Sequence, residues 1–372
     1  MAGNTEDKGG EAVKEFFCKT NILYGSGSAD KIREFGSQRL MVVSDPFFAE
    51  NGTAEKIAEN SGAEQYRIYS GVMPDPTVEQ VAKGTAVVKE FRPDTVVALG
   101  GGSAMDCAKA MVYFSGHSVR FVAVPTTSGS GSEVTDFAIL THEGVKYPLI
   151  DETMRPDVAI LDSNFLKNLP PKLIADTGFD VISHALEAYV AKNSSPVTDA
   201  LAADAFRAAL TNLLRSYQGD CSVRGDMHMA SCMAGMAFTQ AGLGLCHAMS
   251  HTLGGMFHVP HGRLNGILLP AVIQENAAVA ADRYAEIASR AGLGGAAQTV
   301  AVRNLKNSLI RLRSQLQMPG SLAQAGVDTK ALQRATEEIV RTTLLDPCCQ
   351  TNPVPVTGDM IVRILKEVTG TV

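Results

Sequence analysis

The sequence predicts an α/β amino-terminal domain built on a parallel, Rossmann-like sheet, followed by an all-α carboxyl-terminal domain. Short apolar runs alternate with helical patterns as far as about residue 165. One of these runs leads directly into a row of glycines, as the strands of nucleotide-binding sheets do. Beyond residue 165 the short apolar runs cease, and patterns rich in alanine and leucine fill the chain.

Length, charge and cysteine content narrow the class of protein. At 372 residues the chain is too long for one ordinary core. A net charge of −6 without any Lys/Arg cluster argues against nucleic acid as a partner. No apolar run is long enough to cross a bilayer and the amino terminus has no apolar signal core, so we expect a cytoplasmic protein without a membrane partner. An odd number of scattered cysteines favours reduced thiols, and the adjacent pair Cys348 and Cys349 is interpreted as structural because it lacks the usual ligand gap.

Residues 1–17 are polar and rich in glycine, which predicts a disordered tail. A short amphipathic helix at 11–17 that docks to a partner is the alternative. The rest of the chain divides near Leu169-Pro170-Pro171 into an α/β domain over 18–168 and a helical domain over 169–372.

The α/β domain opens with a predicted strand pair whose turn is residues 24–28, followed by a helix from Ala29. Nearly continuous apolar strands that alternate with helices then indicate a parallel sheet covered on both faces. The further elements are strand 39–44, helix 50–61, strand 65–69, helix 77–91, strand 95–99, strand 121–125, strands 137–140 and 146–150 around a turn at 142–144, and strand 157–161. In the second domain, helical patterns fill 171–190, 196–216, 224–257, 263–276, 281–292, 297–317, 329–343 and 358–368.

A glycine turn at residues 100–102 stands between strand 95–99 and a helix that begins near Ser103. This arrangement presents bare backbone N–H groups and a helix N-terminus to a phosphate. The turn matches neither a Walker loop nor the GxGxxG fingerprint. The next strand delivers a second loop, residues 126–135, dense in hydroxyls and glycines. Because both loops follow neighbouring strands, they predict a crevice for a dinucleotide.

Asp45 ends the strand at 39–44 and is positioned to accept hydrogen bonds from an adenosine ribose. A carboxylate there would repel a 2′-phosphate, so NAD is preferred to NADP. The alternative is that Asp45 only caps the helix that follows it.

Polar residues in two apolar stretches of the helical domain predict a metal site. His247 and His251 are four residues apart and stack on one helical face, and His261 follows a turn marked by proline and glycine. Asp180 and His184 have the same spacing on an otherwise apolar helix. Three imidazoles and one carboxylate suit iron, zinc, copper or nickel rather than calcium or magnesium. The alternatives are core histidines bonded to backbone carbonyls and a buried Asp–His hydrogen bond without a metal.

With these residues in place, the chain resembles the iron-containing (group III) alcohol dehydrogenase family along essentially its whole length. Within that family it is most similar to the 1-propanol dehydrogenases of bacterial microcompartments, through residues 177–180, 236–238 and 351–353. It departs from the family at Asp75-Pro76-Thr77, where relatives usually have Asn-Pro-Thr. The matching signatures are Gly100–Ser103 with Asp106 and Lys109, Pro125–Thr135, Asp180–Tyr189 and Gly242–Gly262.

The resemblance implies a metal-dependent, NAD(H)-linked enzyme that interconverts a short-chain primary alcohol, such as 1-propanol or ethanol, and its aldehyde. It places one divalent metal, Fe²⁺ with Zn²⁺ as the alternative, on Asp180, His184, His247 and His261. It places the NAD contacts on Asp45, Gly101, Gly102, Ser103, Asp106, Thr126, Thr127, Ser130 and Lys146.

His251 is the candidate proton relay, and the alternative is a residue that only orients a ligand. Glu187 is expected to orient a ligand or pack the helix rather than act as a base. The rival functions are a polyol dehydrogenase of the 1,3-propanediol, lactaldehyde or glycerol type, a dehydroquinate synthase, and a catalytically idle binding protein of a microcompartment. Expected partners are the small aldehyde or alcohol, further copies in a homo-oligomer (a dimer or larger), and microcompartment enzymes or shell, which would place the protein in the microcompartment lumen.

Overall fold

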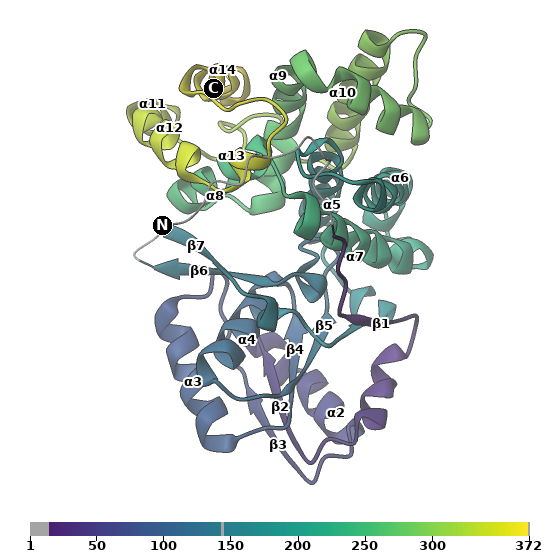
Figure 1. The fold of residues 1–372 in the computed structure, drawn as a ribbon, viewed down its shortest axis with the longest axis vertical. Coiled ribbons are helices and arrows are strands. Elements are labelled where there is room, and N and C mark those ends of the chain that lie inside the picture. The colour runs from purple at the N-terminus through teal and green to yellow at the C-terminus, as the bar shows by residue number, and fades with distance from the viewer. Residues whose placement is uncertain (1–14, 143–144, 371–372) are drawn as a thin grey trace, which may run out of the picture.

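A computed structural model describes residues 15–142 and 145–370, and they form a sheet-containing half and a helical half (Figure 1). The predicted tail at 1–17 and its alternative helix lie mostly outside the described residues, as do two residues of the turn at 142–144. Of the tail, Phe17 lies against the protein, because its carbonyl accepts a hydrogen bond from Gln240 Nε2 at 3.1 Å.

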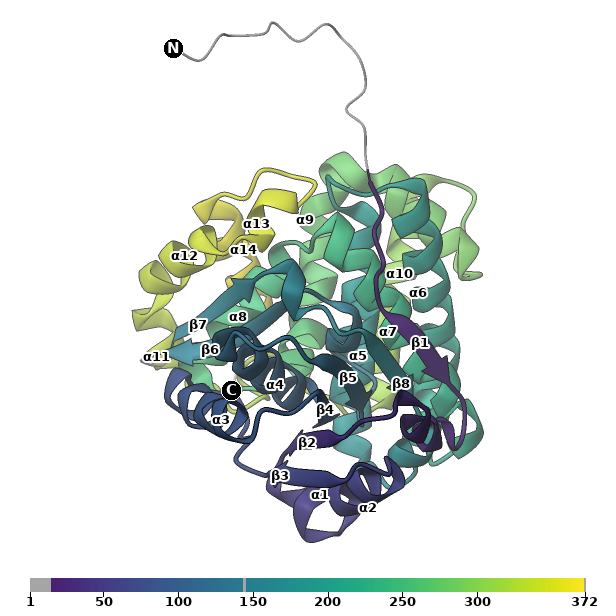
Figure 2. The same cartoon turned by 60° about the horizontal axis from the view of Figure 1, so that its bottom comes forward.

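Six strands form the main sheet in the order β1-β8-β5-β4-β2-β3, and every pairing in it is parallel. Figure 2 shows β1 and β3 at opposite edges. This confirms the predicted parallel α/β sheet. The strands are β1 (Asn21–Tyr24), β2 (Arg39–Ser44), β3 (Gln65–Tyr69), β4 (Thr95–Gly100), β5 (Arg120–Pro125) and β8 (Val158–Leu161).

Both faces of this sheet are covered, so its central strands read as continuous apolar runs. In β4, Val96 and Ala98 pack into the core beneath α3 and α4, whereas Val97 and Leu99 face α2 and a 3₁₀-helix at Ser28–Phe35. The helices of this half are α1 (Pro46–Glu50), α2 (Thr53–Asn60), α3 (Val78–Phe91) and α4 (Gly102–Ser115).

The predicted strand pair around residues 24–28 is wrong. β1 pairs in parallel with β8, with Asn21 opposite Val158, and no second strand follows it directly. Gly25 and Gly27 have φ angles of +114° and +80°, and these turn the chain straight into the 3₁₀-helix. The residues after this turn are therefore helical. β1 is an edge strand of the main sheet and pairs with β8.

A two-stranded antiparallel hairpin stands apart from the main sheet. β6 (Phe137–His142) pairs with β7 (Val145–Ile150), with Phe137 opposite Ile150. The hairpin lies between the sheet-containing half and α8 (Leu245–Phe257) (Figure 1). It therefore reaches from one half of the molecule toward the other.

The described residues from 171 to 370 form helices and no strand, which confirms the predicted all-α second half. We keep the division at residues 168 and 169 as a proposal; β8 ends at Leu161 and α5 begins at Pro171. The helices are α5 (Pro171–Val190), α6 (Pro196–Tyr217), α7 (Arg224–Ala241), α8 (Leu245–Phe257), α9 (His261–Arg290), α10 (Gln298–Gln315), α11 (Thr329–Arg334), α12 (Thr336–Leu345), α13 (Cys348–Thr351) and α14 (Gly358–Thr369).

Three predicted helical patterns are divided differently in the structure. The pattern at 224–257 is two helices, α7 and α8, whose axes differ by 104°. Gly242 makes this bend with a φ of +83°, and a Cβ atom there would come within 2.5 Å of Thr351 Oγ1. The patterns at 263–276 and 281–292 join as α9, which bends at Ala280.

α9 is the one helix among the described residues that is long and apolar enough, by length and composition, to cross a membrane. Of its most apolar window, 67% is buried inside the protein. The same property is found in the core helices of soluble proteins, so it is weak evidence for a membrane span.

Candidate metal and nucleotide site

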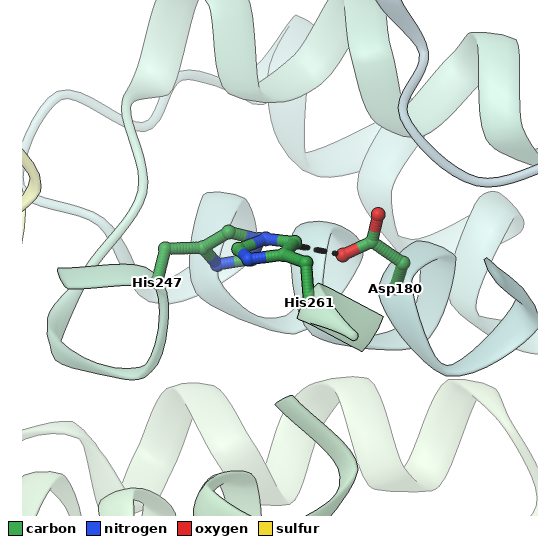
Figure 3. A group of neighbouring side chains, drawn as sticks. All are labelled: Asp180, His247 and His261. Atoms are coloured by element: carbon green, nitrogen blue, oxygen red, sulfur yellow. Dashed lines mark ion pairs between the residues drawn. The ribbon is translucent and has the colours of Figure 1, made fainter. Parts of the chain in front are cut away.

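Asp180 lies at the centre of a cluster of histidines. Its Oδ1 atom is 3.9 Å from His184 Nε2, 3.8 Å from His247 Nε2 and 3.5 Å from His261 Nε2. Asp180 and His184 come from α5, His247 from α8 and His261 from the first position of α9. Figure 3 shows His247 and His261 directed toward the Asp180 carboxylate from separate helices.

Close packing between α5 and α9 brings His261 to Asp180. A Cβ atom on Gly262 would come within 1.9 Å of the Asp176 carbonyl oxygen, so only glycine allows this approach. The guanidinium of Arg263 forms a two-pronged ion pair with the Asp176 carboxylate, at 3.1 and 2.7 Å. Pro260 is the N-cap of α9, so the chain enters the helix directly at His261.

The four side chains fit a divalent transition metal. Ligands about 2.0–2.2 Å from a tetrahedral ion lie about 3.3–3.6 Å from one another. The donor atoms of Asp180, His247 and His261 are all within 4.8 Å of each other, so a small adjustment reaches that geometry. His184 is not part of this close group: its ring stacks on His247 with 4.5 Å between centroids, and its Nε2 lies 3.9 Å from Asp180 Oδ1.

Burial keeps two of the imidazoles uncharged and able to bind a metal. It lowers the pKa of His184 to about 4 and that of His261 well below its usual value. Burial alone would raise the pKa of Asp180, but the nearby histidines lower it, so this carboxyl is ionised. His247 differs: burial would lower its pKa, but the charge of Glu187 raises it to about 9.

Glu187 fixes the orientation of His247. Its Oε2 accepts a hydrogen bond from His247 Nδ1 at 2.5 Å, and its Oε1 accepts one from the backbone N–H of Cys246 at 2.7 Å. Because this bond keeps a proton on Nδ1, a metal bound at the cluster would displace only the Nε2 proton of His247. The expected orienting role of Glu187, rather than that of a base, agrees with these contacts.

Asn265 is a residue of this cluster that the sequence analysis missed. Its Nδ2 donates to Asp180 Oδ1 at 2.8 Å and lies 3.3 Å from Nε2 of both His247 and His261. Its own carbonyl oxygen accepts a hydrogen bond from Ser250 Oγ at 2.5 Å. The available signal was a single amide in an apolar run, four residues after His261 on the same helical face.

His251 lies beside the cluster rather than in it. Its Nδ1 is 2.8 Å from Asp346 Oδ2, and its ring stacks on His261 with 5.2 Å between centroids. Burial would raise the pKa of Asp346, but the hydrogen bond with His251 lowers it to about 2. Asp346 is 95 residues away in the chain, so no local pattern pointed to it.

The glycine turn packs against the second loop with no space for side chains. A Cβ atom on Gly101 would lie 3.2 Å from Thr127 Oγ1, and one on Gly102 would lie 3.2 Å from Ser130 Cβ. The backbone N–H of Thr126 donates to the carbonyl of Gly100 at 2.9 Å. α4 starts at Gly102 with a glycine at its N-cap, so its N-terminus is presented without a capping side chain.

The sequence analysis considered two roles for Asp45, a ribose contact and a helix cap, and its two carboxylate oxygens lie in different surroundings. Its Oδ1 caps α1 by accepting a hydrogen bond from the N–H of Phe48 at 3.2 Å. Its Oδ2 lies beside the end of β4, because a Cβ atom on Gly100 would come within 3.7 Å of it. The cap therefore uses one oxygen, and the other faces the glycine turn.

Two further predicted cofactor residues are engaged within the protein. Asp106 accepts hydrogen bonds from Ser132 Oγ at 2.9 Å and from the N–H of Ile139 at 3.1 Å, which ties α4 to β6. Lys146 forms an ion pair with Asp75 at 2.6 Å. Asp75, the position that departs from the family pattern, has a φ of +53°.

A single cavity of about 470 Å³ joins the glycine turn to the metal cluster. Of the predicted cofactor residues, Gly102, Ser103, Asp106, Ser130 and Lys146 line it, whereas Asp45, Gly101, Thr126 and Thr127 are not among its lining residues. At its other end it is lined by Asp180, His184, His247, His251 and His261. A dinucleotide bound at the turn would thus extend toward the cluster.

Comparison with known proteins relates both halves of the chain to one family. Residues 19–163 match the model described as iron-containing alcohol dehydrogenase, and residues 174–369 match the Fe-containing alcohol dehydrogenase family, C-terminal. Among curated proteins, the chain is 41% identical to the 1-propanol dehydrogenase PduQ of Citrobacter freundii, over 95% of this chain and 100% of that protein. It is 37% identical to the NADPH-dependent butanol dehydrogenase of Clostridium saccharobutylicum, over 95% of this chain and 97% of that protein.

A similar solved structure is that of the sulfoacetaldehyde reductase from Bifidobacterium kashiwanohense in complex with NAD⁺. The TM-score is 0.88 at 27% sequence identity, and the match covers 97% of this chain and 100% of that chain. The fold described above is therefore similar to that of a reductase whose structure was solved with NAD⁺ bound.

Proposed function

This chain belongs to the iron-containing alcohol dehydrogenase family, oxidoreductases that act on CH–OH groups, and we propose that it interconverts short-chain primary alcohols and aldehydes with NAD(H). We assign one divalent metal per chain, Fe²⁺ in preference to Zn²⁺, to Asp180, His184, His247 and His261. The observation that carries the proposal is the convergence of three imidazole Nε2 atoms on Asp180 Oδ1, at 3.5–3.9 Å, in a cavity continuous with the glycine turn.

When bound, a divalent metal supplies Lewis-acid polarisation of the substrate oxygen, and a nicotinamide cofactor supplies or accepts the hydride. The residues of this chain prepare the site for both. Asp180 contributes one negative charge and the histidines none, so a divalent ion would leave about one positive charge to stabilise an alkoxide. Glu187 holds His247 through the ring nitrogen that faces away from the cluster, whereas Asn265 contacts the ligand atoms of Asp180, His247 and His261 themselves.

The His251–Asp346 pair is suited to move a proton during the reaction. The Asp346 carboxylate accepts a hydrogen bond from His251 Nδ1 at 2.8 Å and so holds the proton on that nitrogen. The other ring nitrogen is left as the acceptor on a residue that lines the cavity. His251 is therefore our candidate for general acid–base assistance, and Asp346 positions it.

Cofactor preference rests on Asp45. Its Oδ2 beside the end of β4 would accept hydrogen bonds from a ribose and repel a 2′-phosphate, which favours NAD(H) over NADP(H). The 37% identical butanol dehydrogenase is named as NADPH-dependent, whereas the sulfoacetaldehyde reductase was solved with NAD⁺. Proteins similar to this chain therefore differ in the cofactor that they bind. The two cofactors must be compared directly in this protein.

Substrate length and assembly are proposed from the relatives. Propanol and butanol dehydrogenases at 41% and 37% identity support a primary alcohol of a few carbons. We also propose, from the resemblance stated in the sequence analysis, a homo-oligomer that works beside, or inside, a bacterial microcompartment. A polyol substrate is the competing possibility.

The test is a substrate and cofactor panel with anaerobically purified, metal-analysed protein. We expect NADH oxidation to depend on ethanal, propanal or butanal, with kcat/KM higher for these than for lactaldehyde, and higher with NADH than with NADPH. Preference for a hydroxylated substrate would favour the polyol type. No turnover with any aldehyde or alcohol in metal-loaded protein would refute the proposal.

A further inference from the structure

A second group of potential metal ligands lies in the same cavity, beside the Asp180 cluster. His251 of α8, Asp346 at the end of α12 and Cys348 at the start of α13 each place a ligand atom within 4.8 Å of the other two. This group shares no residue with Asp180, His247 and His261, the other such group in the part of the chain that the structure describes.

Its three members are already held together. His251 Nδ1 and Asp346 Oδ2 are 2.8 Å apart, and the backbone N–H of Cys348 donates to Asp346 Oδ1 at 2.9 Å. The proton between His251 and Asp346 therefore occupies the kind of position, between two donor atoms, that a cation takes.

The group is accessible from the cavity. The side chains of His251 and Asp346 are 26% and 14% exposed, and both line the cavity together with Cys348. An ion bound to these three atoms would keep a fourth coordination position toward the cavity, the arrangement of an open zinc site.

We propose that His251, Asp346 and Cys348 form a second metal site, selective for thiophilic divalent cations such as Zn²⁺ or Cd²⁺. Thiolate and imidazole ligands select these ions over Mg²⁺ and Ca²⁺, and the sulfur separates this site from the sulfur-free Asp180 cluster. Binding forms a metal–sulfur bond and releases the thiol proton to solvent, while the Nδ1 proton of His251 gives way to the ion and Nε2 is protonated from solvent, with no change of oxidation state. The divalent ion, the carboxylate and the thiolate together are neutral, so binding makes the group one unit of charge more positive than it is without the ion.

Adjacent cysteines lack the usual ligand gap, and this is why the sequence alone favoured a structural interpretation of the pair. In the fold, the partners of Cys348 come from α8 and α12 instead. Cys349 points elsewhere, because its Sγ donates to the Thr343 carbonyl oxygen at 3.1 Å. Cys349→Ser is therefore a matched control for Cys348→Ser.

An ion at this site would engage His251 and narrow the cavity next to the Asp180 cluster. It would therefore inhibit alcohol oxidation without displacing the first metal, a consequence that rests on the proposed function. Binding of the ion does not depend on the proposed function, so a protein without alcohol dehydrogenase activity would still bind the ion at this site.

The experiment titrates the iron-loaded enzyme with Cd²⁺ and follows the ultraviolet charge-transfer band of the cadmium–thiolate bond, together with retained iron and turnover. We expect the band to saturate at about one Cd²⁺ per chain while iron stays bound and turnover falls. Cys348→Ser should lose the band and weaken cadmium binding by at least the roughly 10–100-fold that loss of an outer metal-site partner costs. Cys349→Ser should keep both.

A second measurement covers the case in which Cys348→Ser does not fold. In the unmodified enzyme, bound Cd²⁺ should protect the Cys348 thiol from N-ethylmaleimide, as read by peptide mass spectrometry. Persistence of the band in folded Cys348→Ser, an absent band with stoichiometric release of iron, or unprotected Cys348 would each overturn the second site.

Discussion

Replacing Glu187 by glutamine tests how the metal cluster is held together. Glu187 is 2% exposed and both of its oxygens accept hydrogen bonds, from the Cys246 N–H at 2.7 Å and from His247 Nδ1 at 2.5 Å. The amide of glutamine can replace only one of these acceptors. Its NH₂ group must face either the backbone N–H or the imidazole.

Each orientation has a distinct consequence. If the NH₂ group faces the Cys246 N–H, a buried donor loses its partner, which costs about 1–3 kcal/mol of stability. If it faces His247, the ring must accept on Nδ1 and carry its proton on Nε2, the atom 3.8 Å from Asp180. That tautomer cannot bind a metal through Nε2, so affinity should fall by roughly 10–100-fold.

The assay is chelator competition for Fe²⁺ or Zn²⁺, beside unfolding curves of the metal-free proteins. Glu133→Gln is the control, because Glu133 is an equally buried carboxyl outside the metal cluster, whose pKa burial raises to about 7. We expect weaker metal binding for Glu187→Gln alone. Unchanged metal affinity together with unchanged stability of the metal-free variant would refute the orienting role of Glu187.

Three further outcomes follow from the site. Asp45→Gly should shift the ratio of kcat/KM for NADH over NADPH by at least roughly tenfold, since a charge about 4 Å away is worth on the order of a few kcal/mol; an unchanged ratio would leave Asp45 as a cap only. His251→Gln should lower turnover by roughly 10²–10⁴-fold at full metal occupancy, whereas reduced occupancy with normal turnover per bound metal would exclude the relay. Asp346 has a folded pKa of about 2, below its value of about 3.9 in the unfolded chain, so its contribution to stability is present above about pH 4 and lost as the pH falls toward 2. Asp346→Asn should therefore flatten the acid limb of the unfolding free energy between pH 4 and 2, and an identical limb would contradict this assignment.

Local patterns in the sequence were enough to predict the parallel sheet, because its strands are buried on both faces and read as unbroken apolar runs. They also brought together Asp180 and His184, which share a helical face at a spacing of four. The edge strand β1 was paired wrongly, because its partner β8 lies more than 130 residues away and nothing local specifies it. The bend between α7 and α8 was missed because Gly242 and Gly244 can also stand within a helix.

The residues that surround the metal cluster were harder to predict. Asn265 looks like an ordinary helix residue until α9 packs against α5 and brings its amide to Asp180. Asp346 and Cys348 reach His251 only through the packing of α12 and α13 on α8. Such contacts depend on tertiary packing between distant segments, which periodicity in one sequence does not encode.

The central claim is that Asp180, His184, His247 and His261 hold one metal on which the activity depends. Its most direct test is an anaerobic titration of metal-free protein with Fe²⁺, in which bound metal and propanal-dependent NADH oxidation are measured together, beside His261→Ala. We predict that turnover rises linearly with bound metal up to one ion per chain, and that His261→Ala gains neither metal nor turnover while its far-ultraviolet circular dichroism is unchanged. Full turnover by metal-free protein in the presence of chelator, or one tightly bound ion with near-native turnover in His261→Ala, would contradict the claim.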